Sequence, residues 1–170
     1  MPFFDSIQHF LNTGGDVLWI ILWTSTCLWC LIVERLLYFK YTYPKHLELW
    51  INQWESRANK YSKQAFSIRD CIISEARMSM GKTVPIIKML IALCPLLGLL
   101  GTVTGMIHVF DVMAVTGTGN ARAMASGVSQ ATIPTMAGMV IAIAGLYFSK
   151  LIEQRVSEET HHLTDLLKYD

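Results

Sequence analysis

An uncharged stretch over residues 123–149 constrains this chain more than any other part of its sequence. Every third or fourth residue in it is small, so at about 100° per residue these positions stay on one helical face. They are Gly127, Ala131, Thr135, Gly138, Ala142, Gly145 and Ser149. In lipid, helices associate by close packing rather than by hydrophobicity, and small residues let a second backbone approach. The stretch therefore predicts a membrane helix within an assembly of several helices.

Two other uncharged runs are long enough to cross a bilayer, because a spanning helix needs roughly 17 to 25 residues. They cover residues 17–33, extended as an apolar face to residue 39, and residues 89–110. Charged residues make up only 16% of the chain, against about a quarter in a soluble domain. We expect an all-α membrane protein with three transmembrane helices, at 17–39, 89–110 and 123–149, and helical extensions in the cytoplasm.

The basic residues predict how the chain is oriented. Of 14 Lys and Arg residues, ten lie between Glu34 and Lys88, and none lies in residues 1–16. The positive-inside rule then puts residues 40–88 and 150–170 in the cytoplasm, and residues 1–16 and 111–122 outside. Helical periodicity in residues 45–88 predicts amphipathic helices that pack on the inner ends of the spans.

The N-terminal segment carries apolar residues at helical spacing, namely Phe3, Ile7, Phe10 and Leu11. It can form a short amphipathic turn on the outer membrane surface or a frayed end with some aromatic residues. No basic region precedes the first apolar run, so the segment does not resemble a signal peptide.

Cysteines and histidines offer little catalytic chemistry. Cys27 and Cys30 form a C-x-x-C motif, but they lie inside a predicted span without a basic neighbour to lower a thiol pKa. We expect them to be reduced packing residues, with a thiol-redox membrane enzyme as the alternative. The adjacent His161 and His162 cannot both aim at one ion from a helix. Without a nucleophile, phosphate or dinucleotide motif, we expect no enzyme, metal, cofactor or nucleic-acid partner.

Polar residues inside the second and third spans are the candidates for function. Thr102 lies in the second span, and Gln130 and Thr135 lie in the third. Gln130 is costly to expose to lipid, so it should face protein or water. The remaining candidates are the packing residues Gly98, Gly101 and Gly105, which continue the small-residue seam, and the helix-bending residues Pro95 and Pro134.

The two spans carry the blocks Pro95-Leu-Leu-Gly-Leu-Leu-Gly-Thr102-Val and Gly127-Val-Ser-Gln-Ala-Thr-Ile-Pro-Thr135-Met-Ala-Gly138. This pair resembles the ExbB/TolQ/MotA proton-channel family. The resemblance is specific in the second and third spans, and in the first span it extends to topology and the Glu34–Arg35 pair. The predicted cytoplasmic segment matches only in kind.

The resemblance implies a subunit of a proton-driven motor in the bacterial inner membrane. Such subunits form a ring, typically a pentamer, around a single-span ExbD-like partner dimer that supplies an aspartate. Residues matching Thr102 and Thr135 face that aspartate, and the work is delivered through TonB to outer-membrane transporters. No Asp, Glu, Lys or Arg lies within the three uncharged runs, which agrees with a titrating acid from another chain.

One position departs from the family pattern. Well-known ExbB and TolQ members have a glutamate where this chain has Gln130, and a glutamine cannot titrate. The short chain with three spans is most similar to the compact ExbB branch of TonB systems. The alternatives are a TolQ-like subunit for envelope integrity and a membrane scaffold whose seam only assembles helices.

Overall fold

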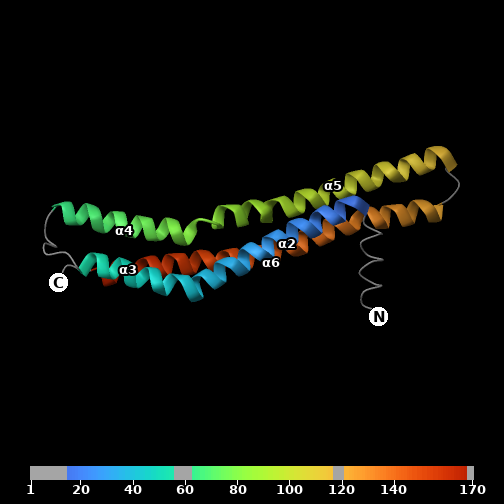
Figure 1. Ribbon diagram of the computed structural model, residues 1–170. Coiled ribbons are helices and arrows are strands. Elements are labelled where there is room, and N and C mark those ends of the chain that lie inside the picture. Colours follow the sequence, from blue (N-terminus) through green and yellow to red (C-terminus); the bar gives the residue numbers. More distant parts are fainter. Residues whose placement is uncertain (1–14, 56–62, 117–120, 168–170) are drawn as a thin grey trace, which may run out of the picture. The chain divides into compact units, whose positions relative to one another are not determined.

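The computed structural model describes residues 15–55, 63–116 and 121–167, and these residues are almost entirely helical (Figure 1). The helices are α2 (Gly15–Leu37), the π-helical η1 (Tyr38–Thr42), α3 (Tyr43–Glu55), α4 (Lys63–Gly81), α5 (Val84–Thr116) and α6 (Ala121–Leu166). The predicted all-α fold is confirmed. The expected amphipathic turn at Phe3, Ile7, Phe10 and Leu11 lies outside the described residues.

Three helical segments are long and apolar enough to cross a membrane, as the sequence predicts. They lie within Gly15–Thr42, Phe66–Val115 and Gly127–Leu166. At about 1.5 Å per residue, the 33 residues of α5 and the 46 of α6 are longer than the roughly 30 Å apolar layer of a bilayer. Both helices therefore continue past the uncharged runs. In α6, no Gly or Pro follows residue 149 to end the helix.

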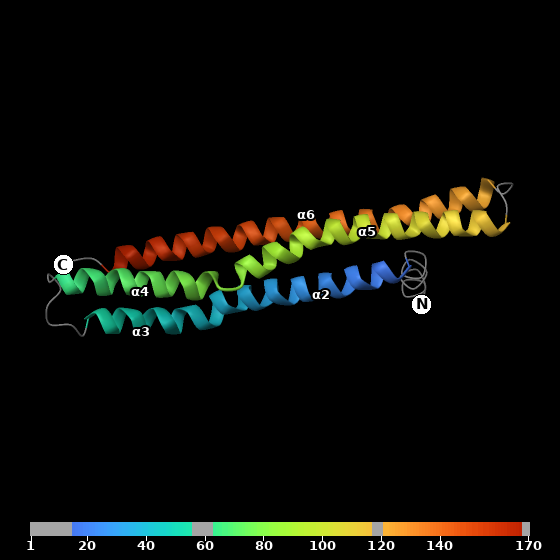
Figure 2. The same cartoon turned by 90° about the horizontal axis from the view of Figure 1, so that it is seen from above.

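The chain divides into two compact units. The first contains the described residues up to Trp29 together with Met89–Leu146, and the second contains Cys30–Lys88 and the described residues from Tyr147 on. In the first unit the beginning of α2 packs on α5 and α6, with Leu18 and Ile21 buried among apolar side chains of the other two helices. Figure 2 shows the same three helices from above.

Close approach of α5 and α6 is the main packing feature of the first unit. A methyl group on Gly98 would lie 2.8 Å from the Cα atom of Thr135, and one on Gly105 would lie 2.9 Å from the Cα atom of Ala131. Real side chains essentially never come so close to backbone, so these positions admit only glycine without a shift. The small face of α6 is thus filled by α5 of the same chain.

The other seam residues extend this contact along both helices. Gly138 faces the carbonyl oxygen of Cys94, Gly145 faces Ile91, and Gly127 faces Val109. Gly101 lies against the ring of Pro134, which is fully buried, and against Val17 of α2. Ala131 and Ala142 are buried, and Pro95 is half-buried inside α5. The sequence pattern along α6 therefore corresponds to an antiparallel helix pair rather than to an exposed groove.

The second unit has its own apolar core. Residues of α3, α4 and the end of α6 share it, and its buried members are Tyr43, Trp50, Ile72, Ala76, Met80, Leu163 and Leu167. Burial, followed by the negative charge of Glu159, raises the pKa of Tyr43 well above its ordinary value. Its phenol therefore stays protonated and donates to the Glu159 carbonyl oxygen at 3.4 Å.

Two arginines hold the ends of helices in the second unit. Arg35, near the end of α2, is 2% exposed, and its Nε donates to the Thr83 hydroxyl at 2.6 Å. Its guanidinium also donates to the Ser79 carbonyl and lies over the ring of Tyr38. Arg69 donates to the carbonyls of Thr164 and Leu167, in the last turn of α6 and just after it.

The seam predicts a steric response to a single methyl group. Gly138→Ala should lower the free energy of unfolding by about 1–3 kcal/mol, because the new Cβ meets the Cys94 carbonyl oxygen and backbone must move. The measurement is the thermal unfolding midpoint of the full chain in detergent. Gly81→Ala is the control, since nothing lies within 4 Å of a methyl group there. Equal midpoints for the two variants would contradict this account of the seam.

Candidate functional site

Thr135 is the polar link between α5 and α6. Its Oγ1 donates a hydrogen bond of 2.9 Å to the carbonyl oxygen of Gly98, which is 37 residues away in the sequence. The bond is possible because Gly98 has no side chain to keep the α6 backbone at a distance. A carbonyl oxygen has two lone pairs, so Gly98 can accept this bond in addition to its helical one. The hydroxyl therefore fixes the register of the helix pair.

Other hydroxyls in these spans donate to their own helices. Thr102 donates to the Leu99 carbonyl at 2.7 Å, and Thr104 donates to the Leu100 and Gly101 carbonyls at 3.0 and 3.1 Å. Thr132 donates to the Ser129 carbonyl at 2.8 Å. Each hydroxyl has one proton to donate and two lone pairs to accept with. In this arrangement the hydroxyls of Thr102 and Thr135 can accept hydrogen bonds but cannot donate further ones.

Thr102 and Thr135 bond the carbonyls of adjacent residues in one turn of α5, Leu99 and Gly98. Thr135 binds the carbonyl of Gly98, and Thr102 follows Gly98 by four residues, which is about one helical turn. Both threonines are half-buried. Both threonines thus bond carbonyl oxygens of the same turn of α5.

Gln130 belongs to a different place. It is exposed and lines a cavity of about 510 Å³ between α2, α5 and α6, and neither Thr102 nor Thr135 lines that cavity. The polar side chains in its wall come from all three helices: Asp16, Thr104, His108 and Gln130. The cavity exists partly because Gly15, Gly101, Gly105 and Gly127 also line it and have no side chains. Gln130 faces this polar space, as its amide requires.

The backbone adds an acceptor to this cavity. Pro134 has no N–H group, so the carbonyl of Gln130, four residues earlier, lacks its usual helical donor. Asp16 and His108 were missed in the sequence, where they are a residue before the first span and an isolated histidine near the end of the second. The sequence could have indicated only that Asp16 and His108 lie at a similar depth in the membrane. Whether they line one cavity depends on how α2, α5 and α6 pack together.

All four cysteines of the described residues are free thiols. Cys27, Cys30 and Cys71 are exposed free thiols, and Cys94 is buried. Within residues 15–55, 63–116 and 121–167, no three His, Cys, Asp or Glu side chains are grouped as metal ligands. The polar side chains that line the cavity of the first unit are one hydroxyl, one amide, one carboxylate and one imidazole.

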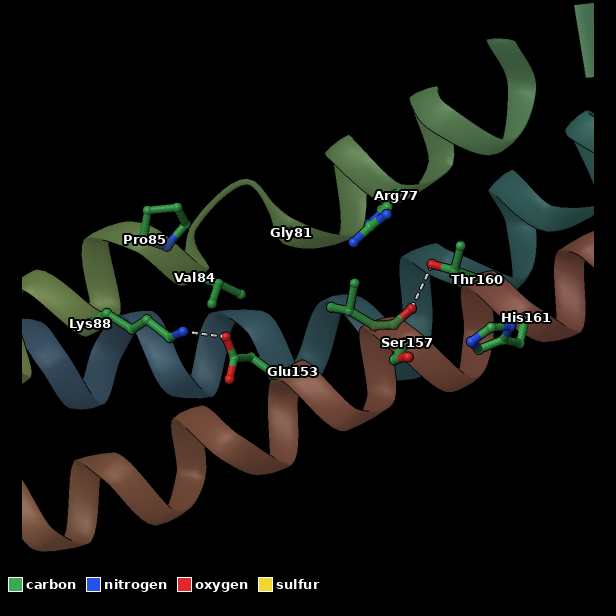
Figure 3. Close-up of a pocket in the computed structure, with 10 residues that line it drawn as sticks. Arg77, Gly81, Val84, Pro85, Lys88, Glu153, Ser157, Thr160 and His161 are labelled. Atoms are coloured by element: carbon green, nitrogen blue, oxygen red, sulfur yellow. Dashed lines mark hydrogen bonds and ion pairs between the residues drawn. The ribbon is translucent and has the colours of Figure 1, made fainter. Parts of the chain in front are cut away.

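A second cavity of about 490 Å³ lies in the second unit, between the end of α4, the start of α5, and α6 (Figure 3). The ammonium of Lys88 pairs with the carboxylate of Glu153 across it. Arg77 and His161 line the same cavity, and both are exposed. No residue predicted from the spans contributes to this cavity.

Comparison with known proteins identifies the family to which the chain is similar. Residues 46–165 match the model of the MotA/TolQ/ExbB proton channel family, which covers α3 to α6. Two proteins of Synechocystis sp. named as ExbB-like biopolymer transport proteins are similar. ExbB-like 1 is 41% identical over 87 residues, which are 49% of this chain and 34% of that protein. ExbB-like 3 is 41% identical over 64 residues, which are 36% of this chain and 30% of that protein.

These alignments cover about a third of the length of each relative. The family model, in contrast, extends over well more than half of this chain and includes both spans in which Thr102 and Thr135 lie. Three apolar helices long enough to cross a membrane agree with a channel. The chain therefore belongs to the MotA/TolQ/ExbB proton channel family.

Proposed function

We propose that this chain is the ring-forming subunit of a proton-driven motor in the inner membrane of a Gram-negative bacterium. In this proposal about five copies surround an ExbD-like single-span partner, whose aspartate carries the proton through the membrane. The motor works on a TonB-like transducer and energises outer-membrane uptake, for example of iron–siderophore complexes. The N-terminus faces the periplasm and the C-terminus the cytoplasm, in agreement with ten Lys and Arg residues between Glu34 and Lys88.

The observation that carries the proposal is the pair of hydroxyls around Gly98. Thr135 donates to Gly98 and Thr102 donates to Leu99, so both offer only lone pairs to a further group. A protonated carboxylic acid can donate to such a lone pair, whereas a carboxylate cannot. The pair therefore favours the protonated form of the partner's aspartate.

This preference gives a direction to proton transfer. An acid that is stabilised in its neutral form, in a site of low dielectric, has a raised pKa and takes up a proton readily. When the partner moves away from the two threonines toward water, its carboxyl group loses that preference and releases the proton. One elementary charge crossing the membrane potential releases about 2.3 kcal/mol per 100 mV, so several transfers can drive mechanical work.

The cavity beside Gln130 is suited to supply protons from the periplasmic end of the spans. Asp16 and His108 line it together with Gln130 and Thr104. A carboxylate at the mouth of a cavity attracts cations, and polar side chains can hold water. Gln130 takes part as a hydrogen-bonding group rather than as a titrating one. The proton pathway of the proposal begins here and continues to the partner's acid.

Removing the Thr135 hydroxyl tests the motor. Thr135→Val keeps the shape of the side chain but removes both the bond to Gly98 and the acceptor, so energy-dependent ferric-siderophore uptake should fall about tenfold or more. The assay uses a strain deleted for this gene and its paralogues, with each variant returned beside its cognate partner at matched membrane levels. Thr135→Ser keeps the hydroxyl and should retain most of the uptake.

Each outcome of that assay has a clear meaning. If wild type restores uptake and Thr135→Val restores it equally well, the proposed role of the hydroxyl is wrong. If wild type restores nothing, the link to TonB is wrong, and recovery of outer-membrane integrity would favour the TolQ-like function instead. If the chain is a scaffold that conducts no protons, Thr135→Val and Thr135→Ser should restore uptake to the same extent.

Neutralising Asp16 tests the path of the proton. Asp16→Asn should lower the initial rate of proton influx into liposomes by about two- to fivefold, because one attracting charge is lost from the cavity. The liposomes contain the chain and its partner, and a pH-sensitive dye reports the flux. Asp111→Asn is the matched control, since Asp111 is exposed on α5 and does not line the cavity. The same decrease in both variants would show that Asp16 acts only through general surface charge.

A further inference from the structure

The cavity in the second unit combines two kinds of wall. Its apolar wall is made of Val84, Pro85 and Val156, and its polar wall is made of residues from α4, α5 and α6. The polar members are Arg77, Lys88, Glu153, Ser157, Thr160 and His161. Figure 3 shows Arg77 extending from α4 toward the space beside α6, and Lys88 extending from α5 to Glu153. The proton pathway proposed above uses none of these residues.

The polar wall has an excess of positive charge. Lys88 and Glu153 form an ion pair and together add no net charge. Arg77 has no hydrogen bond or ion pair with any residue that the structure describes, so its five N–H donors remain available. The Thr160 hydroxyl donates to the Val156 carbonyl at 2.6 Å and offers no proton, whereas the hydroxyl of Ser157 is exposed. The cavity therefore offers donors and positive charge to an anion.

Phosphate is the anion that these donors fit best. A guanidinium can donate two parallel hydrogen bonds to a phosphate group, and an ammonium adds a second charge. Lys88 is 54% exposed and Glu153 is 34% exposed, so their pair is accessible to water and can open to share Lys88 with a ligand. Glu153 repels an anion and sets the affinity below what the basic residues alone would give.

The position of the cavity in the sequence indicates where the phosphate comes from. Lys88 immediately precedes the uncharged run 89–110, and Glu153 lies one helical turn after the uncharged run 123–149. This end of the cavity is thus at the level where lipid headgroups begin, on the side of the chain that carries most basic residues. Basic pockets between membrane helices on that side bind anionic headgroups. We propose that this cavity binds the phosphodiester headgroup of an anionic phospholipid.

In the proposed complex Arg77 donates to the phosphate, Ser157 donates to one of its oxygens, and Lys88 adds positive charge at the other end of the cavity. Val84, Pro85 and Val156 contact the glycerol and the first methylene groups of the lipid. A headgroup held in this way joins α4 to α6 through its contacts. A zwitterionic lipid has the same phosphate but brings a cation that Arg77 repels, so the site discriminates by charge.

The test is a lipid titration of the full chain in detergent, read by native mass spectrometry. The probes are dioleoyl phosphatidylglycerol, dioleoyl phosphatidylcholine and inorganic phosphate. Wild type should bind phosphatidylglycerol (the glycerol lipid) in preference to phosphatidylcholine (the choline lipid). Arg77→Gln should weaken binding of the glycerol lipid about fivefold, and Glu153→Gln should strengthen it by a similar factor. Arg155→Gln is the control, because Arg155 is an exposed basic residue of α6 outside the cavity, and it should change nothing.

Arg77→Gln and Glu153→Gln are expected to change lipid affinity in opposite directions. Misfolding cannot explain both changes, since a misfolded variant cannot bind more tightly. Equal affinity for the two lipids, or equal losses in Arg77→Gln and Arg155→Gln, overturns the proposal. Binding of inorganic phosphate that depends on Arg77 without a preference for the glycerol lipid would identify a soluble phosphate instead. If Arg77→Gln changes only the oligomeric state, a second copy rather than a lipid occupies the cavity, and the proposal is again wrong.

Discussion

Contact between α5 and α6 at backbone distance is the constraint on which the rest of the first unit depends. Lipid tails are as apolar as leucine, so only dispersion at short range and hydrogen bonds can hold these helices together. Gly98, Gly105 and Gly138 remove the side chains that would prevent the approach. The approach then lets a short side chain reach across, and Thr135 bonds the Gly98 carbonyl at 2.9 Å. The close packing at Gly98 is thus what makes the hydrogen bond from Thr135 possible.

Because α5 fills the small face of α6, most of that face is not available to a second chain. The exposed faces of α6 in the first unit carry large apolar residues, and Val140 and Ile143 are both 68% exposed. Such faces suit lipid or a neighbouring helix equally well. In the proposed motor the partner's acid meets this face at Thr135, whose hydroxyl donates to Gly98 and keeps its lone pairs for a further donor.

The sequence predicted the features that repeat along a single helix. It missed the features that depend on how three helices pack together. Uncharged runs indicated the spans, and the spacing of Gly127, Ala131 and Gly138 indicated a packed face, because both patterns repeat along a single helix. The cavity that groups Asp16 and His108 with Gln130 depends on the rotation of α2, α5 and α6 about their axes. The donor bonds of Thr102 and Thr135 depend on rotamers and register, which no spacing in the sequence specifies.

Arg35 shows how the second unit holds a membrane helix at its end. A buried cation is unfavourable unless its donors are used, and among the described residues no carboxylate pairs with it. Its donors go instead to the Thr83 hydroxyl and the Ser79 carbonyl, beside the turn where α4 ends and α5 begins. Separating α2 from this turn would leave the charge without those bonds, at a cost of several kcal/mol. The end of α2 and the start of α5 are therefore expected to move together.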